Sequence, residues 1–201
     1  MKTLRIHLIR HGATDANKFG QYVGSRTDIP ISPEGLKQLR ELAETIEYPR
    51  IDTLYSSPML RCRQTAAVLF PETEITVIDD LREYDFGEFE GKTAAELENN
   101  QYFLEWAAGK RTAPPGGEDN LDFTKRLCLG LNQIVHDMTE RGSKSAGVIM
   151  HGGAIMMLLA ACAVPRHKPV EWMADPGRGY TLLITPSLYH KSGIVEAIGI
   201  I

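Results

Sequence analysis

Two short apolar runs end in a histidine that is followed by glycine. Residues 8–12 read LIRHG and residues 148–153 read VIMHGG. Histidine can act as a nucleophile toward phosphorus, because an imidazole with an ordinary pKa of about 6.5 is largely neutral at pH 7. Attack would form a phosphohistidine and would split one difficult transfer into two easier ones. His11 and His151 therefore indicate chemistry on a phosphoryl group.

An anion site also needs cations. Arginine suits phosphate, because its planar guanidinium binds two oxygens at once and stays charged. Arg10 lies beside His11, and Arg61 and Arg63 fall on a helix expected over residues 57–70. Residues two apart on a helix do not share a face. We therefore expect only one of these two arginines to point inward, and the periodicity does not choose between them.

Transfer through histidine requires a proton donor for the leaving oxygen. A carboxyl group can serve where burial or nearby anions raise its pKa. The Gly-rich, acidic segment at 81–92 offers Glu83, Asp85, Glu88 and Glu90. This reasoning places the acid in the segment but does not select the residue.

The strands and helices that must hold these residues alternate along the chain. Apolar patterning predicts strands at 4–9, 51–55, 75–78, 146–150, 180–185 and 194–200. It predicts helices at 33–47, 57–70, 93–108, 119–141 and 153–163. Such alternation is typical of a three-layer αβα sandwich, with a mostly parallel central sheet and helices on both faces. We expect one domain over residues 1–201.

The segment 81–117 departs from this alternation and is expected to be an inserted, lid-like segment. Its aromatic residues Phe103 and Trp106 are expected to form the core of the lid. Ligands of open α/β sheets bind at the carboxyl ends of the strands, which is where both His-Gly pairs lie. Glycine allows close approach of the backbone, and a helix starting after His151 would direct free N–H groups at an anion.

Composition excludes several classes of protein. The chain has 201 residues and a formal charge of −4, so it has no general attraction for nucleic acid or an anionic membrane surface. No run approaches the ~20 apolar residues of a membrane span. The apolar run within residues 1–9 is short and interrupted, so we do not expect it to be a signal peptide. The three cysteines are Cys62, Cys128 and Cys162. They are widely spaced and expected to be reduced and buried, so we expect a cytoplasmic protein without a metal site.

Five blocks of the sequence resemble the histidine phosphatase superfamily, which includes cofactor-dependent phosphoglycerate mutases. Residues 8–17 (LIRHGATDAN) resemble the family signature. The other blocks match in order at 56–66 (SSPMLRCRQTA), 81–91 (LREYDFGEFEG), 115–118 (PGGE) and 151–153 (HGG). The resemblance implies a phosphoglycerate mutase-like fold. Separately from the resemblance, we expect the protein to need no cofactor.

The resemblance also implies roles for single residues. His11 would be the phosphorylated nucleophile, and Glu83 the general acid and then the general base. Arg10, Arg61 and His151 would hold the phosphoryl oxygens. Phosphate or substrate contacts would come from five further residues: Asn17, Tyr22, Val23, Gly24 and Gly152.

Three positions depart from the family pattern and bear on the substrate. Val23 stands where the family often has a polar residue, Ser25 where it often has Trp, and Met156 where many members have Arg. Fewer cations favour a small metabolite with one phosphate. The short, acidic third block and the chain length favour a phosphatase, and an α-ribazole phosphatase-like activity is one possibility.

Several alternatives stay open. A phosphoglycerate mutase would use the same histidine, and a non-catalytic phosphate-binding module would need only the pocket. A metal-dependent hydrolase is disfavoured by the absence of HxH and HExxH spacing. The protein could be a monomer or a homodimer.

Overall fold

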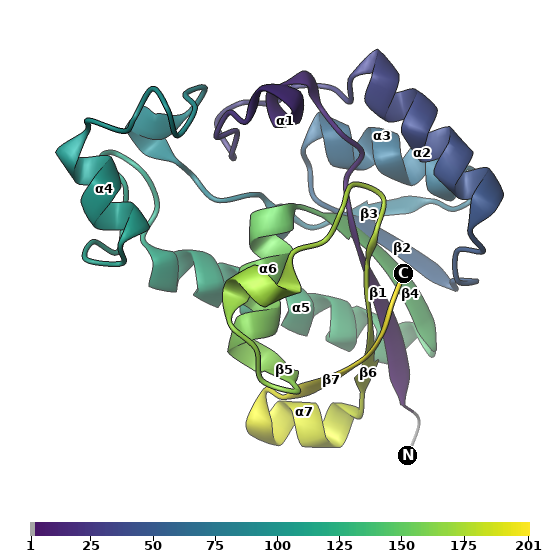
Figure 1. Cartoon of the computed structure of the whole chain (residues 1–201). Coiled ribbons are helices and arrows are strands. Elements are labelled where there is room, and N and C mark those ends of the chain that lie inside the picture. The colour runs from purple at the N-terminus through teal and green to yellow at the C-terminus, as the bar shows by residue number, and fades with distance from the viewer. Residues whose placement is uncertain (1–2) are drawn as a thin grey trace.

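A seven-stranded sheet forms the centre of the computed structural model, which describes residues 3–201 (Figure 1). Met1 and Lys2 of the expected domain lie outside the described residues. The strands are β1 (Leu4–Arg10), β2 (Thr53–Ser56), β3 (Ile75–Val77), β4 (Ser145–Met150), β5 (Ala163–Val164), β6 (Gly179–Ile184) and β7 (Val195–Ile200). They are ordered β3-β2-β4-β1-β6-β7-β5. Only β6 runs antiparallel to its neighbours, so the prediction of a mostly parallel sheet is confirmed.

Helices cover both faces of the sheet, as expected (Figure 1). The α-helices are α1 (Asp15–Phe19), α2 (Pro33–Thr45), α3 (Leu60–Leu69), α4 (Gln101–Ala107), α5 (Asn120–Arg141), α6 (Gly152–Cys162) and α7 (Pro186–Ser192). Three 3-10 turns are η1 (Asp79–Leu81), η2 (Gly87–Phe89) and η3 (Pro169–Trp172). None of the helices in residues 3–201 is long and apolar enough to cross a membrane.

Two apolar cores follow from this layering. The larger core joins α5 and α6 to one face of the sheet, with Leu8 of β1 and Val148 of β4 fully buried. The smaller core joins Cys62 and Ala66 of α3 to Ile9 and Ile149, which point to the opposite face of the same two strands. Because successive strand residues alternate between faces, β1 and β4 are buried on both sides and read as near-continuous apolar runs.

Two predicted helices are shorter than the sequence suggested. Residues 93–99 form turns, and only α4 is helical in the predicted range 93–108. Asn100 caps α4 by accepting a hydrogen bond from the Phe103 N–H, which fixes the helix start there. The helix predicted from residue 57 begins at Leu60, whose N–H donates to Asp28 (2.7 Å). Helix α1, helix α7 and strand β5 are too short to give a clear sequence period.

The segment 81–117 forms a lobe that carries η2 and α4 and stands beside the sheet (Figure 1). Phe103 packs with Phe89 and Leu97 in a small core of its own, and Trp106 lies against it half-buried. The expectation that Phe103 and Trp106 belong to the core of this segment therefore agrees with the structure.

Candidate active site

The parallel pairing of β1 and β4 brings the two His-Gly sequences together. Arg10 is paired in register with Met150, and the His11 N–H donates to the Met150 carbonyl (2.9 Å). His11 and His151 therefore both lie one residue beyond the ends of neighbouring strands. Their ring centroids are 5.2 Å apart with an interplanar angle of 64°, and both side chains are buried.

The hydrogen bond of His11 defines its tautomer. Nδ1 lies 2.8 Å from the Gly12 carbonyl oxygen, which can only accept, so Nδ1 carries the proton. Burial, reinforced by the nearby Arg61 charge, lowers the pKa of His11 to about 3. The imidazole is therefore neutral near pH 7 and keeps an unprotonated Nε2, which is the form that can attack phosphorus.

Arg10 and Arg61 are the two cations that face this pair. Nη1 of Arg10 donates to the Ala174 carbonyl (2.7 Å), while its buried Nε has no hydrogen-bond partner within residues 3–201. Arg61 is 1% exposed and donates to the carbonyls of Gly24 and Thr27, both at 3.1 Å. A guanidinium has five donors, so both side chains retain N–H groups for an anion.

Arg63, the other candidate on α3, is exposed. Arg61 and Thr65 are four residues apart and lie on the buried face of α3. The structure therefore selects Arg61, between the two arginines that periodicity left equal.

Glu83 is the carboxyl group that reaches the cluster. Its Oε1 accepts from the Tyr84 N–H (2.9 Å) and its Oε2 from the Gly153 N–H (3.0 Å). Burial raises the pKa of Glu83, although these two N–H groups and the charges of Arg61 and Arg10 act in the opposite direction. A carboxyl group in this setting holds its proton to higher pH than an exposed one.

The other three acids of the segment are used elsewhere. Asp85 pairs with Arg26 (2.7 Å), and Glu88 is exposed. Glu90 accepts hydrogen bonds from the Gly24 N–H (3.1 Å) and the Thr27 hydroxyl (2.7 Å). Glu90 therefore holds the 24–27 loop, whose carbonyls bind Arg61.

The two glycines after His151 lie close to the side chains of Arg10 and Glu83. A Cβ on Gly152 would lie 3.2 Å from Nε of Arg10, and a Cβ on Gly153 would lie 2.7 Å from Oε1 of Glu83. Glycine at both positions thus lets the side chains of Arg10 and Glu83 lie close to the start of α6, and a larger residue would have to displace them.

The predicted substrate contacts lie on the loops around the cluster. Asn17 is exposed in α1, and its Oδ1 accepts from the N–H (2.9 Å) and hydroxyl (3.0 Å) of Thr14, as part of the helix cap. Tyr22 and Val23 are half-buried, and the Tyr22 ring packs 5.2 Å from that of Phe86 in the 81–117 segment. Capping of α1 is therefore the structural role that these hydrogen bonds give Asn17.

Gly24 is buried beside Arg61. A Cβ there would lie 1.8 Å from the Tyr84 carbonyl oxygen, so the loop and the 81–117 segment can meet only at a glycine. Together with the Glu90 contacts, this joins the 24–27 loop to the segment that carries Glu83.

Two residues that hold the cluster were not singled out from the sequence. Ser57 is buried, and its hydroxyl lies 2.8 Å from Nε2 of His151. The Thr65 hydroxyl accepts from the Gly12 N–H (2.9 Å) and donates to the Arg61 carbonyl (2.7 Å). The partner of Ser57 lies 94 residues away in sequence, and no local pattern shows such a contact.

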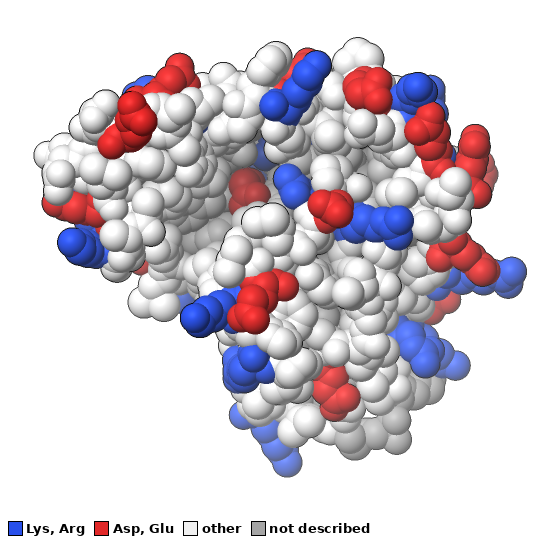
Figure 2. All heavy atoms as spheres, viewed as in Figure 1, with Lys and Arg blue, Asp and Glu red and all other residues white. Residues whose placement is uncertain are grey.

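Figure 2 shows the surface hollowed between the lobe that carries α4 and the rest of the molecule, with acidic and basic groups near its floor.

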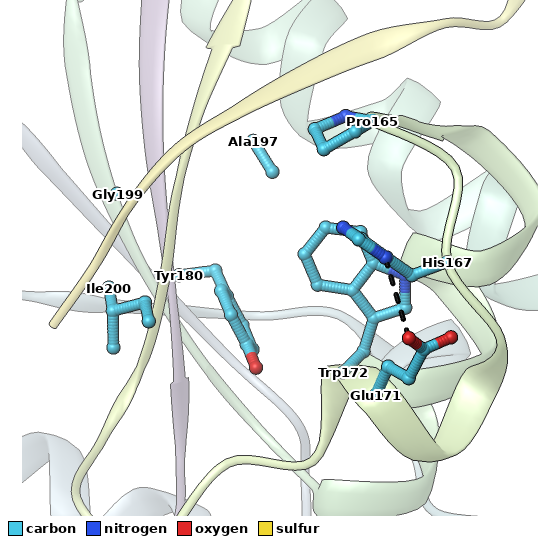
Figure 3. A pocket seen from close by; sticks show the side chains of 8 residues that line it. All are labelled: Pro165, His167, Glu171, Trp172, Tyr180, Ala197, Gly199 and Ile200. Carbon is cyan, nitrogen blue, oxygen red and sulfur yellow. Dashed lines mark ion pairs between the residues drawn. The ribbon is translucent and has the colours of Figure 1, made fainter.

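A separate cavity of about 350 Å³ lies between η3, β6 and β7 (Figure 3). Its walls are the aromatic rings of Trp172 and Tyr180, and His167 lies at its edge, paired with Glu171 (3.7 Å). None of the predicted site residues lines this cavity. Residues 3–201 also contain no group of three or more His, Cys, Asp or Glu that could hold a metal ion.

Comparison with known proteins identifies relatives of this chain. The family model of the histidine phosphatase superfamily (branch 1) matches residues 6–186 of this chain. The 2,3-bisphosphoglycerate-dependent phosphoglycerate mutase of Rhizobium etli is 30% identical over 168 residues, which cover 79% of this chain and 78% of the relative. The uncharacterized phosphatase PhoE of Bacillus subtilis is 30% identical over 158 residues, covering 76% and 74%.

The fold has solved counterparts. The structure of the mycobacterial glucosyl-3-phosphoglycerate phosphatase superposes with a TM-score of 0.81 at 24% identity, over 98% of this chain and 97% of that one. The phosphoglycerate mutase of Bacillus anthracis superposes with a TM-score of 0.77 at 19% identity, over 98% of this chain and 92% of that one, which confirms the expected phosphoglycerate mutase-like architecture.

Proposed function

The chain belongs to the histidine phosphatase superfamily, and on that premise we propose that it hydrolyses a small-molecule phosphomonoester through a phosphohistidine on His11. One observation carries the proposal. A neutral His11 with an unprotonated Nε2 lies in a buried cluster with Arg10, Arg61 and a carboxyl group, Glu83, whose pKa is raised.

The first step transfers the phosphoryl group to the enzyme. Nε2 of His11 attacks phosphorus, the bond from phosphorus to the leaving oxygen breaks, and protonated Glu83 gives its proton to that oxygen. Arg10 and Arg61 bind the phosphoryl oxygens and offset the charge that builds up on them. Burial, with a further contribution from Arg61, lowers the pKa of His151 well below its ordinary value, so this imidazole acts as a neutral hydrogen-bonding partner.

The second step returns His11 to its starting state. Glu83, now a carboxylate, accepts a proton from water while the water oxygen attacks phosphorus and the N–P bond breaks. Inorganic phosphate leaves, and Glu83 is protonated again for the next substrate. The alcohol part of the substrate lies beside the loop residues, with Asn17, Tyr22, Val23, Gly24 and Gly152 as its proposed contacts or those of its phosphate.

Two features support a substrate with a single phosphate. The cluster has two arginines, and Tyr22, one of the proposed substrate contacts, packs against two apolar rings of the 81–117 segment, those of Phe86 and Trp106, which also contact each other. We further propose that residues 1–201 form one domain with 81–117 as its lid, and that the protein acts without a cofactor, as a monomer or homodimer. Three unpaired cysteines, Cys62, Cys128 and Cys162, fit the reducing cytoplasm.

The proposal predicts hydrolysis rather than isomerisation. In a panel of small phosphomonoesters, we expect the best substrate to release inorganic phosphate with kcat/KM on the order of 10⁴ M⁻¹ s⁻¹ or above. 3-Phosphoglycerate, tested in the presence of 2,3-bisphosphoglycerate, should be isomerised slowly by comparison. Efficient isomerisation with little phosphate release would identify a mutase, and phosphate binding without turnover of any ester would identify a binding module.

Gly153→Ala should reduce activity without removing a chemical group. The new Cβ would stand 2.7 Å from Oε1 and 3.2 Å from Oε2 of Glu83, so the carboxyl group must move. Displacement of a catalytic group by about 1 Å can cost about 100-fold, and we expect kcat to fall by about tenfold or more. Gly199→Ala is the matched control, because a Cβ there has no neighbour within 4 Å. Equal activity of the two variants would argue against Glu83 acting from this position.

A further inference from the structure

Arg126 of α5 uses all five donors of its guanidinium on Glu118 and on the main chain of residues 80–83. Nη1 donates to the carbonyls of Asp80 and Arg82, both at 2.8 Å, and Nη2 donates to the carbonyl of Glu83 itself (3.0 Å). The remaining two donors, Nε and Nη2, bind Oε1 and Oε2 of Glu118, both at 2.8 Å. This pairing of Arg126 and Glu118 is called the brace below.

Glu118 extends the brace to the other side of Glu83. Its N–H donates to the Asp85 carbonyl (3.0 Å), and its Oε2 is 3.5 Å from the Asp85 N–H. The brace thus forms hydrogen bonds with the main chain on both sides of Glu83, at Arg82 and Asp85, and with Glu83 itself. The side chains of Arg126 and Glu118 are only 16% and 18% exposed, so the pair is shielded from water, unlike most surface ion pairs.

The packing of α5 supports the same contact. Gly130 lies in the middle of this 22-residue helix, where glycine is less favourable than alanine. A Cβ there would approach Cβ of Asp80 and Cδ2 of Leu81 at 3.2 Å. The helix therefore gives up intrinsic stability to let η1 lie close, directly before Glu83.

We propose that Arg126 and Glu118 are positioning residues that fix the main chain of Glu83 so that its carboxyl group can give a proton to the leaving oxygen. This inference rests on the proposed function. The brace does not touch the phosphoryl group, because all five donors of Arg126 are already used. It therefore acts on proton transfer through Glu83 and not on phosphate binding.

The test compares esters that differ in their need for a proton. Phenyl phosphate has a leaving oxygen that requires one, whereas 2,4-dinitrophenyl phosphate releases a phenolate that is stable without it. Since general acid catalysis contributes about 10²–10⁴-fold, we expect Arg126→Met to lower kcat/KM for phenyl phosphate by about tenfold or more and to leave that for 2,4-dinitrophenyl phosphate nearly unchanged. The ratio kcat/KM reports the step in which the phenol leaves.

Controls separate positioning from folding. Glu118→Gln keeps the shape of the side chain and should show the same selective loss, so the test does not depend on Arg126→Met being stable. Lys125→Met is the matched control, because Lys125 directly precedes Arg126 on α5 and forms an ion pair with Asp122 at the exposed surface (3.4 Å). It should behave like the wild type on both esters.

Three outcomes are informative. Equal losses on the two esters, or no loss on either, would overturn the positioning role. A Glu83→Gln variant that shows the selective loss while the brace variants do not would reject the brace and keep the proposed function. A wild-type protein that hydrolyses neither ester, nor any member of the phosphomonoester panel, would reject the proposed function itself.

Discussion

His11→Ala should abolish phosphate release, with a loss on the order of 10⁴-fold or more. Without the imidazole no covalent intermediate forms, and only binding and charge stabilisation by the remaining groups persist. The measurement is steady-state phosphate release, paired with trapping of the intermediate. Wild-type protein incubated with a ³²P-labelled ester and denatured in alkali, where phosphohistidine survives, should retain label that the variant lacks.

The control for this variant is His136→Ala. His136 is an exposed histidine of α5, and its removal should leave both activity and labelling unchanged. Within residues 3–201 the His11 side chain makes one hydrogen bond, to the carbonyl of its neighbour Gly12, and the main-chain bond to Met150 is kept in alanine. The variant should therefore still fold, which circular dichroism can verify. Phosphate release by folded His11→Ala at a rate near that of the wild type would eliminate the covalent mechanism.

The sequence predicted part of what brings the two histidines together. Each follows an apolar run, and in a parallel sheet the carboxyl ends of neighbouring strands lie together. The remaining condition was that β1 and β4 be neighbours, although His11 and His151 are 140 residues apart in the chain. That adjacency is a property of the whole fold, and the structure supplies it.

The choice between Arg61 and Arg63 is one that helical spacing alone could not make. Both lie on α3, and their spacing indicates only that they point in different directions. Arg61 is the buried one because Cys62 and Ala66 pack on the smaller core, which turns Arg61 and Thr65 toward His11 and leaves Arg63 in solvent. Orientation of a helix about its axis depends on packing partners from other elements.

The contacts of the brace could not be predicted from the sequence. Arg126 is one of several charged residues on an amphipathic helix, and a charge there is usually solvated. Its partners Asp80, Arg82 and Glu83 precede it by 43 to 46 residues. No helical period relates them, so the contact is visible only in three dimensions.

Glu83→Gln should lower kcat/KM for esters with poor leaving groups by about 10²–10⁴-fold, the usual contribution of a general acid. Glutamine is nearly isosteric and can accept from one of the two N–H groups, of Tyr84 and Gly153, that now hold the carboxyl group. It cannot release a proton to the leaving oxygen. Glu88→Gln is the matched control, because Glu88 is an exposed acid of the same segment and should leave the rate unchanged.

The activity should depend on pH through the protonation states of Glu83 and His11. Glu83 must be protonated to act as the acid, and His11 must be unprotonated to attack. Burial raises the pKa of Glu83, opposed by the two N–H groups and by Arg61 and Arg10, so the active protonated form persists to higher pH than for an ordinary carboxyl group. Burial and Arg61 lower the pKa of His11 to about 3, so its inactive cationic form appears only in strong acid.

The rate should therefore fall as pH rises through the raised pKa of Glu83, and no loss should occur near pH 6.5 from protonation of an ordinary histidine. The substrate phosphate titrates in the same region, with a second pKa of about 6, and would blur a single profile. The ratio of wild-type to Glu83→Gln kcat/KM cancels that ionisation, because both proteins use the same ester. This ratio should be large at low pH and decline toward one as Glu83 loses its proton, and a ratio independent of pH would show that Glu83 is not the proton donor.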